Sequence, residues 1–217
     1  MTADTAIILG SRSPGRLQLL QDLYGDDRIR SVPPANPQES GFAGLVTDDC
    51  IITRLQQIVQ QKFEGVKSQL ASAAESVAAS IIICADTIIV AGEPGQRIVL
   101  GQPPADDWQD LVRNWFTHLL SGTTHEVHTA VLVARGQHVQ QQVVTTHVTF
   151  HDLSPELIDW YLTTAESIGK AGGYAIQGKA AAFVAGVSGS LTSVIGLPLL
   201  ETSQLIRSVL AAETGST

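Results

Sequence analysis

An apolar stretch rich in β-branched residues covers residues 81–90 and is interrupted by one charged side chain, Asp86. The stretch is rich in isoleucine and is too short to span a membrane. Such a run is typical of a β-strand that is buried on both faces. A carboxylate in these surroundings is costly unless a metal, a cation or several hydrogen-bond donors meet it. Asp86 is therefore either a structural group that braces a bend or loop, or a functional acid.

Shorter patterns predict the other strands and helices. Continuous or alternating apolar residues predict strands over 6–10, 98–100, 125–135, 138–150 and 181–187. Apolar residues at helical spacing predict helices from Pro14, from Asp48 through Lys67, over 105–120, from Pro155 and from Pro198. Strands and helices alternate early, whereas a long antiparallel hairpin lies in the middle of the chain. This order predicts one domain over residues 1–217, with a mixed twisted α/β sheet in two lobes rather than a clean doubly wound sheet.

A strand, a tight loop and a helix start follow one another near the beginning of the sequence. Ser13 is a good N-cap and Pro14 a good first helical residue. The loop offers backbone N–H groups, the hydroxyls of Ser11 and Ser13, and the guanidinium groups of Arg12 and Arg16 to an anion. An ordinary capped helix carries the same pattern, so the loop alone is only a candidate phosphate site.

A second candidate loop covers residues 166–178 and contains Lys170 and four glycines. Glycines permit close approach of the backbone to a ligand, but a flexible surface connection has the same composition. His125 and His128 have a spacing that metal sites use. Because they lie on a predicted strand, their side chains point to opposite faces, which argues against a shared metal.

Composition and charge narrow the function classes. The chain has 217 residues and a formal net charge of −8, which argues against binding to duplex nucleic acid but permits local sites for anionic small molecules. Cys50 and Cys84 form no disulfide framework. The sequence shows no basic signal-peptide start and no apolar stretch of about 18 residues. We therefore expect no membrane span and a reducing, cytoplasmic location.

Six segments resemble the signature motifs of one family, the Maf proteins, and they occur in the family's order across nearly the whole chain. They are Gly10-Ser11-Arg12-Ser13-Pro14-Gly15-Arg16, Ala85-Asp86-Thr87, the segment 120–129 with Leu-Ser-Gly-Thr-Thr-His, the segment 170–178 with Lys-Ala-Gly-Gly-Tyr-Ala-Ile-Gln-Gly, and the closing segments 189–190 and 194–199.

The resemblance implies a nucleoside triphosphate pyrophosphatase that forms the monophosphate and pyrophosphate with a divalent cation, Mg²⁺ or Mn²⁺. The form of the segment 170–178 resembles the branch that acts on dTTP, UTP and modified pyrimidine nucleotides. The implied fold has a deep central cleft between two lobes, and family members often form homodimers.

The resemblance also implies roles for single residues. Asp86 matches the family's proton acceptor and is a candidate base or metal ligand, and Glu39 matches an acid that shares the ion. Ser11, Ser13 and Arg16 match the phosphate-binding loop. Lys62 and Lys170 match lysines that can neutralise phosphate charge. Thr87 and Gln177 match positions that the family uses to select the base.

Four positions depart from the family pattern: Gly15, Gln102, Gly169 and Leu191. Gly15 stands where the family usually has an arginine tied to substrate choice, and Gln102 where it has a lysine. Arg12 lies in the same loop as Gly15 and is a candidate replacement. Three readings stay open: a dTTP/UTP pyrophosphatase, a pyrophosphatase of shifted specificity, and a nucleotide-binding regulatory protein with little turnover.

Overall fold

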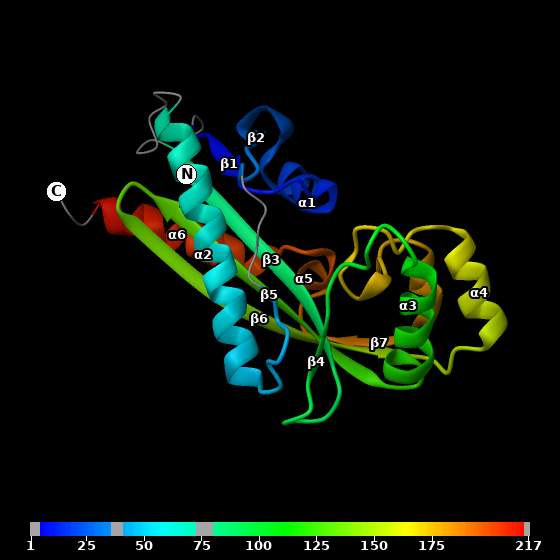
Figure 1. The fold of residues 1–217 in the computed structure, drawn as a ribbon. Coiled ribbons are helices and arrows are strands. Elements are labelled where there is room, and N and C mark those ends of the chain that lie inside the picture. Colours follow the sequence, from blue (N-terminus) through cyan, green and yellow to red (C-terminus); the bar gives the residue numbers. More distant parts are fainter. Residues whose placement is uncertain (1–4, 36–40, 73–79, 215–217) are drawn as a thin grey trace.

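The protein is built on one mixed, seven-stranded sheet (Figure 1). The computed structural model describes residues 5–35, 41–72 and 80–214. The strands are β1 (Ile7–Leu9), β2 (Ile29–Ser31), β3 (Ile81–Ala91), β4 (Ile98–Leu100), β5 (Thr124–Arg135), β6 (His138–Phe150) and β7 (Val184–Ser188). The order is β2-β1-β3-β5-β6-β7, and β4 also pairs with β3. β1 runs parallel to β2 and β3, and the other pairs are antiparallel. The predicted mixed α/β class is confirmed.

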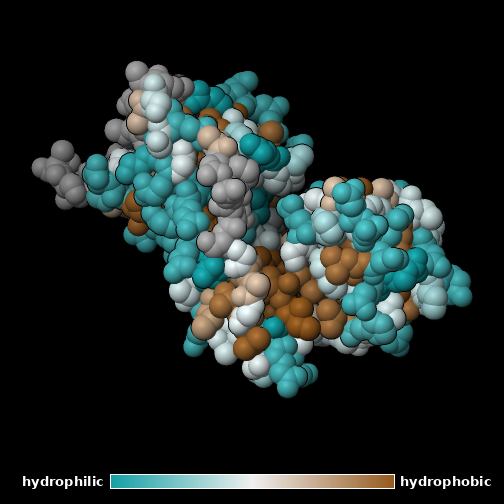
Figure 2. Space-filling view, viewed as in Figure 1, coloured by the Kyte–Doolittle hydropathy of each residue, from teal (hydrophilic) through white to brown (hydrophobic). Residues whose placement is uncertain are grey.

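Helices cover both faces of this sheet, and others lie beside its far end (Figure 1). The helices are α1 (Pro14–Tyr24), α2 (Asp48–Ser72), α3 (Trp108–Trp115), α4 (Pro155–Thr163), α5 (Leu191–Ile195) and α6 (Leu199–Thr214), with short 3₁₀ segments at Asp26–Arg28, Ala171–Gly173 and Lys179–Phe183 and a π-helical turn at Phe116–Leu120. α2 and α6 lie on opposite faces of the sheet. The first lobe contains β1, β2, α1, α2 and α6, and the second lobe contains α3, α4 and β7 (Figure 1). Figure 2 shows a notch in the surface between the lobes, and the depth of the predicted cleft stays a prediction.

The two faces of β3 are covered by different helices in the first lobe. Ile82, Cys84 and Ile88 pack with buried residues of α2. Ile81, Ile83 and Ala85 pack with buried residues of α1 and α6. Because successive residues of a strand point to opposite faces, the continuous apolar run fills both sides of the sheet. The prediction of a strand buried on both faces is confirmed.

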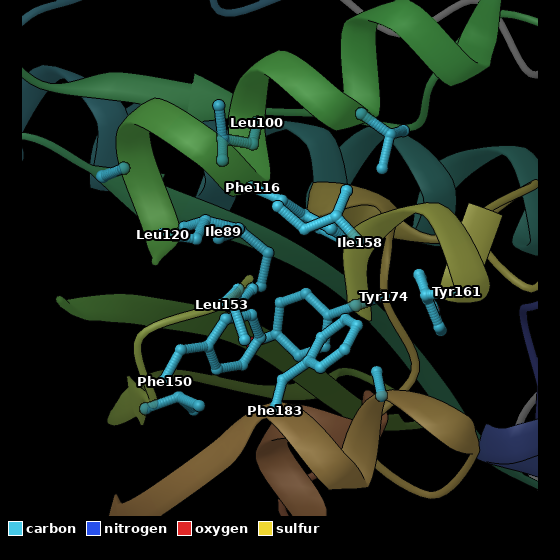
Figure 3. Close-up of a cluster of buried hydrophobic side chains, with 14 of the residues drawn as sticks. Ile89, Leu100, Phe116, Leu120, Phe150, Leu153, Ile158, Tyr161, Tyr174 and Phe183 are labelled. Carbon is cyan, nitrogen blue, oxygen red and sulfur yellow. The ribbon is translucent and has the colours of Figure 1, made fainter. Parts of the chain in front are cut away.

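The second lobe has its own core, which is rich in aromatic rings (Figure 3). Phe116 stacks edge-on against Phe183 with ring centroids 5.6 Å apart, and Tyr161 approaches Phe183 to 4.9 Å. The ring centroids of Tyr174 and Phe150 are 5.0 Å apart. Edge-to-face contacts of this kind add to the stability from burial alone. The π-helical turn at Phe116–Leu120 carries Phe116 into this core.

One edge of β3 is shared by two partners. β1 pairs with residues 81–83 and β4 with residues 89–91 on the same edge, while β5 pairs with residues 82–90 on the other. Within the described part of the chain, residues 84–88 therefore have a strand neighbour on one edge alone. This break in the sheet lies between the lobes and contains Asp86.

Some helices and strands begin or end at other residues than the sequence predicts. The predicted strand over 181–187 is shifted, because Lys179–Phe183 forms a 3₁₀ helix and the strand begins at Val184. The sequence predicts no helix between residue 187 and Pro198, yet α5 begins at Leu191, capped by the Ser190 side chain, which accepts from the Ser193 N–H. The described helices contain none that is long and apolar enough to cross a membrane.

Candidate active site

The break in the sheet presents a carboxylate on one face of β3 and a hydroxyl on the other. Asp86 points toward α2, where its Oδ1 accepts a hydrogen bond of 2.6 Å from Lys62 Nζ. The side chains of Lys62 and Asp86 retain only 15% and 16% of their exposure. Thr87, the next residue, points to the opposite face, toward α1 and α5. An acid that the sequence left unpartnered therefore has a cation beside it.

Arg16 is held on the Thr87 side by acceptors from distant parts of the chain. Its Nε donates to the Gly196 carbonyl at 2.7 Å, its Nη1 to Ser11 Oγ at 3.2 Å, and its Nη2 to Thr87 Oγ1 at 3.1 Å. Gly196 follows α5 and has a φ of 127°, a conformation that favours glycine. The guanidinium plane is thereby fixed at the junction of α1, β3 and the end of α5.

The loop between β1 and α1 has the geometry that the sequence predicts. Ser13 is the N-cap of α1, since its side chain accepts from the Arg16 N–H, and Pro14 begins the helix. The Ser13 N–H donates to Ser11 Oγ at 3.1 Å. Ser11 is buried, whereas Arg12 is exposed. The loop thus combines two hydroxyls with a helix N-terminus, which is the arrangement expected of an anion site.

Positive charge surrounds the middle of β3. Burial raises the pKa of the Cys84 thiol to about 12, although the nearby charges of Lys62 and Arg16 act in the opposite direction. Cys84 also packs tightly on the start of the loop between β1 and α1, because a Cβ at Gly10 would clash with its Sγ. The two cations therefore flank the strand from opposite faces, close to Asp86.

The second lobe brings two further candidates toward this site. Gly172 has a φ of 65°, and a Cβ there would lie 2.6 Å from Ile89 Cγ1, so the loop that carries Lys170 rests on the face of β3 that also presents Thr87. The Gly172 N–H also donates to the Gly101 carbonyl at 3.0 Å. Lys170 itself is exposed. Gln177 is exposed as well, with its Oε1 3.8 Å from the position of a Cβ on Gly15.

The four departures lie in different settings. Gly15 is half-buried, and a side chain there would meet Ile195 and Gln177 at ordinary contact distances, so the fold does not demand glycine. Gln102 is exposed next to Gly101. Gly169 has a φ of 71° in open space. Leu191 is 53% exposed at the start of α5.

The predicted metal ligands are only partly visible. Glu39 lies outside the described residues. Among those that are described, no cluster of three histidine, cysteine or acidic side chains could hold a metal ion. His125 and His128 do point to opposite faces, as predicted. His125 contacts Tyr174 through its Nε2 at 2.8 Å, whereas His128 contacts Thr145 and Glu126.

Two groups near Arg16, the carbonyl of Gly196 and the side chain of Thr129, lie in segments that resemble the family motifs, but the sequence assigned neither of them a role. Thr129 is fully buried on β5, and its Oγ1 lies 3.0 Å from Thr87 Oγ1. Alternation along 127–133 indicates that Thr129 shares a face with its apolar neighbours. A buried threonine in such a strand is interpreted as packing, and the contact with Thr87 requires the sheet register.

Comparisons with known proteins give a consistent result. The family model described as Maf-like protein matches residues 6–209. A dTTP/UTP pyrophosphatase of Anaeromyxobacter sp. (strain Fw109-5) is 37% identical over 207 residues, which cover 93% of this chain and 88% of the relative. A dTTP/UTP pyrophosphatase of Anaeromyxobacter dehalogenans (strain 2CP-1) is 38% identical over 206 residues, with 93% and 92% covered.

Similarity to solved structures is weaker. A dITP/XTP pyrophosphatase from Mycobacterium abscessus matches 74% of this chain and 95% of its own, with a TM-score of 0.33 and 13% identity, too low to bear on the site. The family model and the curated relatives span nearly the whole chain, and the chain belongs to the Maf-like protein family.

Proposed function

We propose that this protein hydrolyses a nucleoside triphosphate, namely dTTP, UTP or a modified pyrimidine nucleotide, to the monophosphate and pyrophosphate. Relatives that share more than a third of its sequence are named dTTP/UTP pyrophosphatases. The observation that carries the proposal is the pairing of an acid with flanking cations at the break in the sheet. Asp86, Lys62 and Arg16 converge there from β3, α2 and α1.

Asp86 is the proposed general base. Its Oδ1 accepts from Lys62, and no hydrogen bond to Oδ2 occurs within the described residues, so Oδ2 is available to a water molecule. The water oxygen attacks the α-phosphorus, its proton passes to Asp86, and the bond from the α-phosphorus to the bridging oxygen breaks. Pyrophosphate leaves with the electron pair of that bond. Lys62 holds the carboxylate in one orientation throughout.

The other candidates bind the substrate in this proposal. Arg16 and the loop with Ser11 and Ser13 hold phosphate oxygens through charge-assisted hydrogen bonds. Lys170 and Arg12 are exposed and supply further positive charge at the rim. Gln177 can both donate and accept, which suits contact with a pyrimidine edge. Thr87 lies beside Arg16, where the family resemblance also implies base selection.

A divalent cation, Mg²⁺ or Mn²⁺, fits this donor set. Mg²⁺ typically binds one or two carboxylates, completed by phosphate oxygens and waters, so the single described carboxylate of Asp86 is sufficient on the protein side. As the alternative to its role as the base, Asp86 would hold the ion, with Glu39 as the second proposed ligand. The ion would neutralise phosphate charge and orient the triphosphate. The assignment of residues 1–217 to a single domain, homodimerisation and a cytoplasmic location stay predictions from the sequence.

A second candidate function rests on the departures from the family pattern. Gly15 and Gln102 each stand where the family usually supplies a cation, and both lie on segments that reach the site. Loss of one charge-assisted contact to phosphate costs about 1.5–3 kcal/mol, which is roughly ten- to a hundredfold in binding or rate. A pyrophosphatase of shifted specificity, or a nucleotide-binding protein with little turnover, would follow.

A substrate panel separates these functions. The purified protein is offered common and modified nucleoside triphosphates with Mg²⁺ and then with Mn²⁺, while monophosphate and pyrophosphate are measured. The Asp86→Asn variant is the control. Turnover of dTTP or UTP that is lost in the control supports the proposal, and turnover of a different nucleotide indicates shifted specificity. Silence across the panel, with tight nucleotide binding in calorimetry, rejects the enzyme.

A further inference from the structure

Four groups form a hydrogen-bonded chain that runs from the phosphate loop to α5. Arg16 Nη2 lies 3.1 Å from Thr87 Oγ1, which lies 3.0 Å from Thr129 Oγ1. Thr129 Oγ1 lies 2.8 Å from the carbonyl oxygen of Ser193. The chain crosses from α1 through β3 and β5 to α5, and Thr129 at its centre is fully buried.

The chemistry of the two ends fixes the direction of every proton. The Ser193 carbonyl only accepts, so Thr129 must donate its single proton to it. Thr129 then accepts from Thr87, which uses the only proton of the Thr87 hydroxyl. Arg16 only donates, so Thr87 must turn a lone pair toward it. Each hydroxyl can take one orientation alone while the chain is intact.

We propose that Thr129 is a positioning residue for Arg16, acting through the hydroxyl of Thr87. Because Thr129 accepts the hydrogen bond from the Thr87 hydroxyl, Thr87 turns a lone pair toward Arg16 rather than a competing O–H donor. The Thr87 hydroxyl is therefore committed to Arg16 and has no proton to give to a substrate base. The inference rests on the proposed function, because Arg16 is taken to hold phosphate oxygens.

The same short helix anchors the guanidinium a second time. Arg16 Nε donates to the carbonyl of Gly196, which caps α5. The carbonyl of Ser193, within α5, accepts a hydrogen bond from the Thr129 hydroxyl. Ile195 packs with the core of the first lobe and Val194 with that of the second. The Thr129 hydroxyl thus attaches α5 to β5, and the end of α5 presents the Gly196 carbonyl to Arg16. One buried hydroxyl therefore influences both the Thr87 contact and the Gly196 contact of the guanidinium.

A neighbouring threonine provides a matched control. Thr146 on β6 is also fully buried, and its Oγ1 donates to the Ser190 carbonyl and accepts from the Ser190 N–H at the other end of α5. Valine at position 129 or 146 keeps the volume of threonine and removes a hydroxyl that bonds to α5. Thr129 is linked to Arg16 through Thr87, whereas Thr146 bonds to Ser190. Only the change at position 129 therefore breaks a hydrogen-bonded connection to Arg16.

The experiment compares Thr129→Val, Thr129→Ser and Thr146→Val with the wild-type chain. Calorimetry gives the Kd of inorganic tripolyphosphate without divalent metal, dTTP kinetics give KM and kcat separately, and thermal unfolding gives stability. We expect Thr129→Val to raise the Kd and the KM about tenfold with a smaller change in kcat. Thr129→Ser should restore both to within about twofold. Thr146→Val should lower the melting temperature by about as much as Thr129→Val does and should leave the Kd of tripolyphosphate unchanged.

A second variant keeps the inference testable if Thr129→Val does not fold. Thr87→Val breaks the link at the Arg16 end and leaves the bond from Thr129 to Ser193 in place. It should raise the Kd for tripolyphosphate to the same extent. Unchanged affinity in either variant, equal weakening by Thr146→Val, or absence of tripolyphosphate binding to the wild-type chain would overturn the inference. Failure of the proposed function is seen separately, as absence of dTTP and UTP turnover while tripolyphosphate binding still responds to Thr129.

Discussion

Lys62 Nζ lies 2.6 Å from Asp86 Oδ1, across the contact between α2 and β3. A lone carboxylate in an apolar strand is costly, and among the described residues this cost is met by a lysine rather than by a set of backbone donors. Both side chains keep a small exposed fraction, and within the described residues no strand pairs with the edge of β3 beside them. A purely structural ion pair would have no need for an unpaired strand edge. The arrangement favours the catalytic interpretation of Asp86.

The first prediction concerns Asp86→Asn. Asparagine keeps the shape of aspartate and can still accept from Lys62, whose amine retains some contact with solvent. The melting temperature should therefore change by no more than about 3 °C. Turnover should fall about 10²–10⁴-fold, as expected for loss of a general base. Differential scanning calorimetry and pyrophosphate release measure the two effects.

The matched control for this variant is Asp159→Asn. It removes a carboxylate that pairs with Arg113 on the surface of the second lobe, away from β3. Turnover should be unchanged in this control. Full activity of Asp86→Asn would exclude Asp86 as the base.

The parts of the site that the sequence predicted are local. A β-branched run predicts the buried strand around Asp86, and Ser13 followed by Pro14 predicts the start of α1, because both signals depend on neighbouring residues. The contacts that complete the site are long-range. Arg16 reaches Gly196 across 180 positions of the chain, and no periodicity encodes such a contact.

The elements that were missed have weak local signals. α5 is five residues long and lies in a small-residue segment, so its propensity is outweighed by its packing and by the Ser190 cap. The segment 179–183 is alanine-rich and suits a short helix, but its apolar composition resembles that of a buried strand. The proximity of Gly15 and Gln177 depends on how the two lobes meet, which sequence alone does not specify.

The second prediction tests whether Gly15 explains any shift in substrate. Space at this position accepts a side chain, because the nearest atoms would lie 3.6–3.8 Å from a Cβ on Gly15. Gly15→Arg should lower the KM for dTTP about tenfold, because it adds a charged donor beside the phosphate loop. Gly15→Ala supplies the side-chain carbon without the charge. It should raise the free energy of unfolding by about 0.5 kcal/mol through helix propensity and leave the KM unchanged. A KM that rises in Gly15→Arg would mean that the new guanidinium obstructs the site.

The third prediction concerns how the Lys170 loop rests on β3. Gly172 and Gly169 both have positive φ, but a Cβ at Gly172 would clash with Ile89, whereas Gly169 faces open space. Backbone strain costs about 1–2 kcal/mol at either position. Gly172→Ala should cost about 1–3 kcal/mol more than Gly169→Ala, since it also overpacks Ile89. It should reduce turnover as well, because the loop must move away from the strand that carries Asp86.

A double-mutant cycle tests the cause of that difference. Ile89→Ala removes Cγ1, the atom nearest to the new Cβ at 2.6 Å, and Cγ2, and it leaves the Ile89 Cβ at 3.0 Å. The double variant Gly172→Ala with Ile89→Ala should therefore be more stable than the sum of the single effects predicts. Additive free energies from denaturant unfolding would show that Ile89 is not the obstacle.

The fourth prediction concerns the acid stability of the second lobe. His125 is buried against Phe150 and Tyr174, and burial lowers its pKa from 6.5 to about 4. Between these two values the unfolded chain binds a proton at His125 that the folded chain does not. Stability from this group is therefore complete above pH 6.5 and is lost as the pH falls toward 4. The free energy of unfolding falls by about 3 kcal/mol, since each pH unit between the two pKa values corresponds to about 1.4 kcal/mol.

His125→Gln isolates this contribution, because glutamine does not titrate and can still bond to the Tyr174 hydroxyl. Urea unfolding at about pH 7 and about pH 4.5 should show a decrease in stability that is about 2–3 kcal/mol smaller in the variant than in the wild-type chain. His118→Gln, which changes an exposed histidine of the same lobe, should decline with the wild type. Equal declines in all three proteins would show that His125 is not the group that titrates, and would place the acid sensitivity elsewhere in the fold.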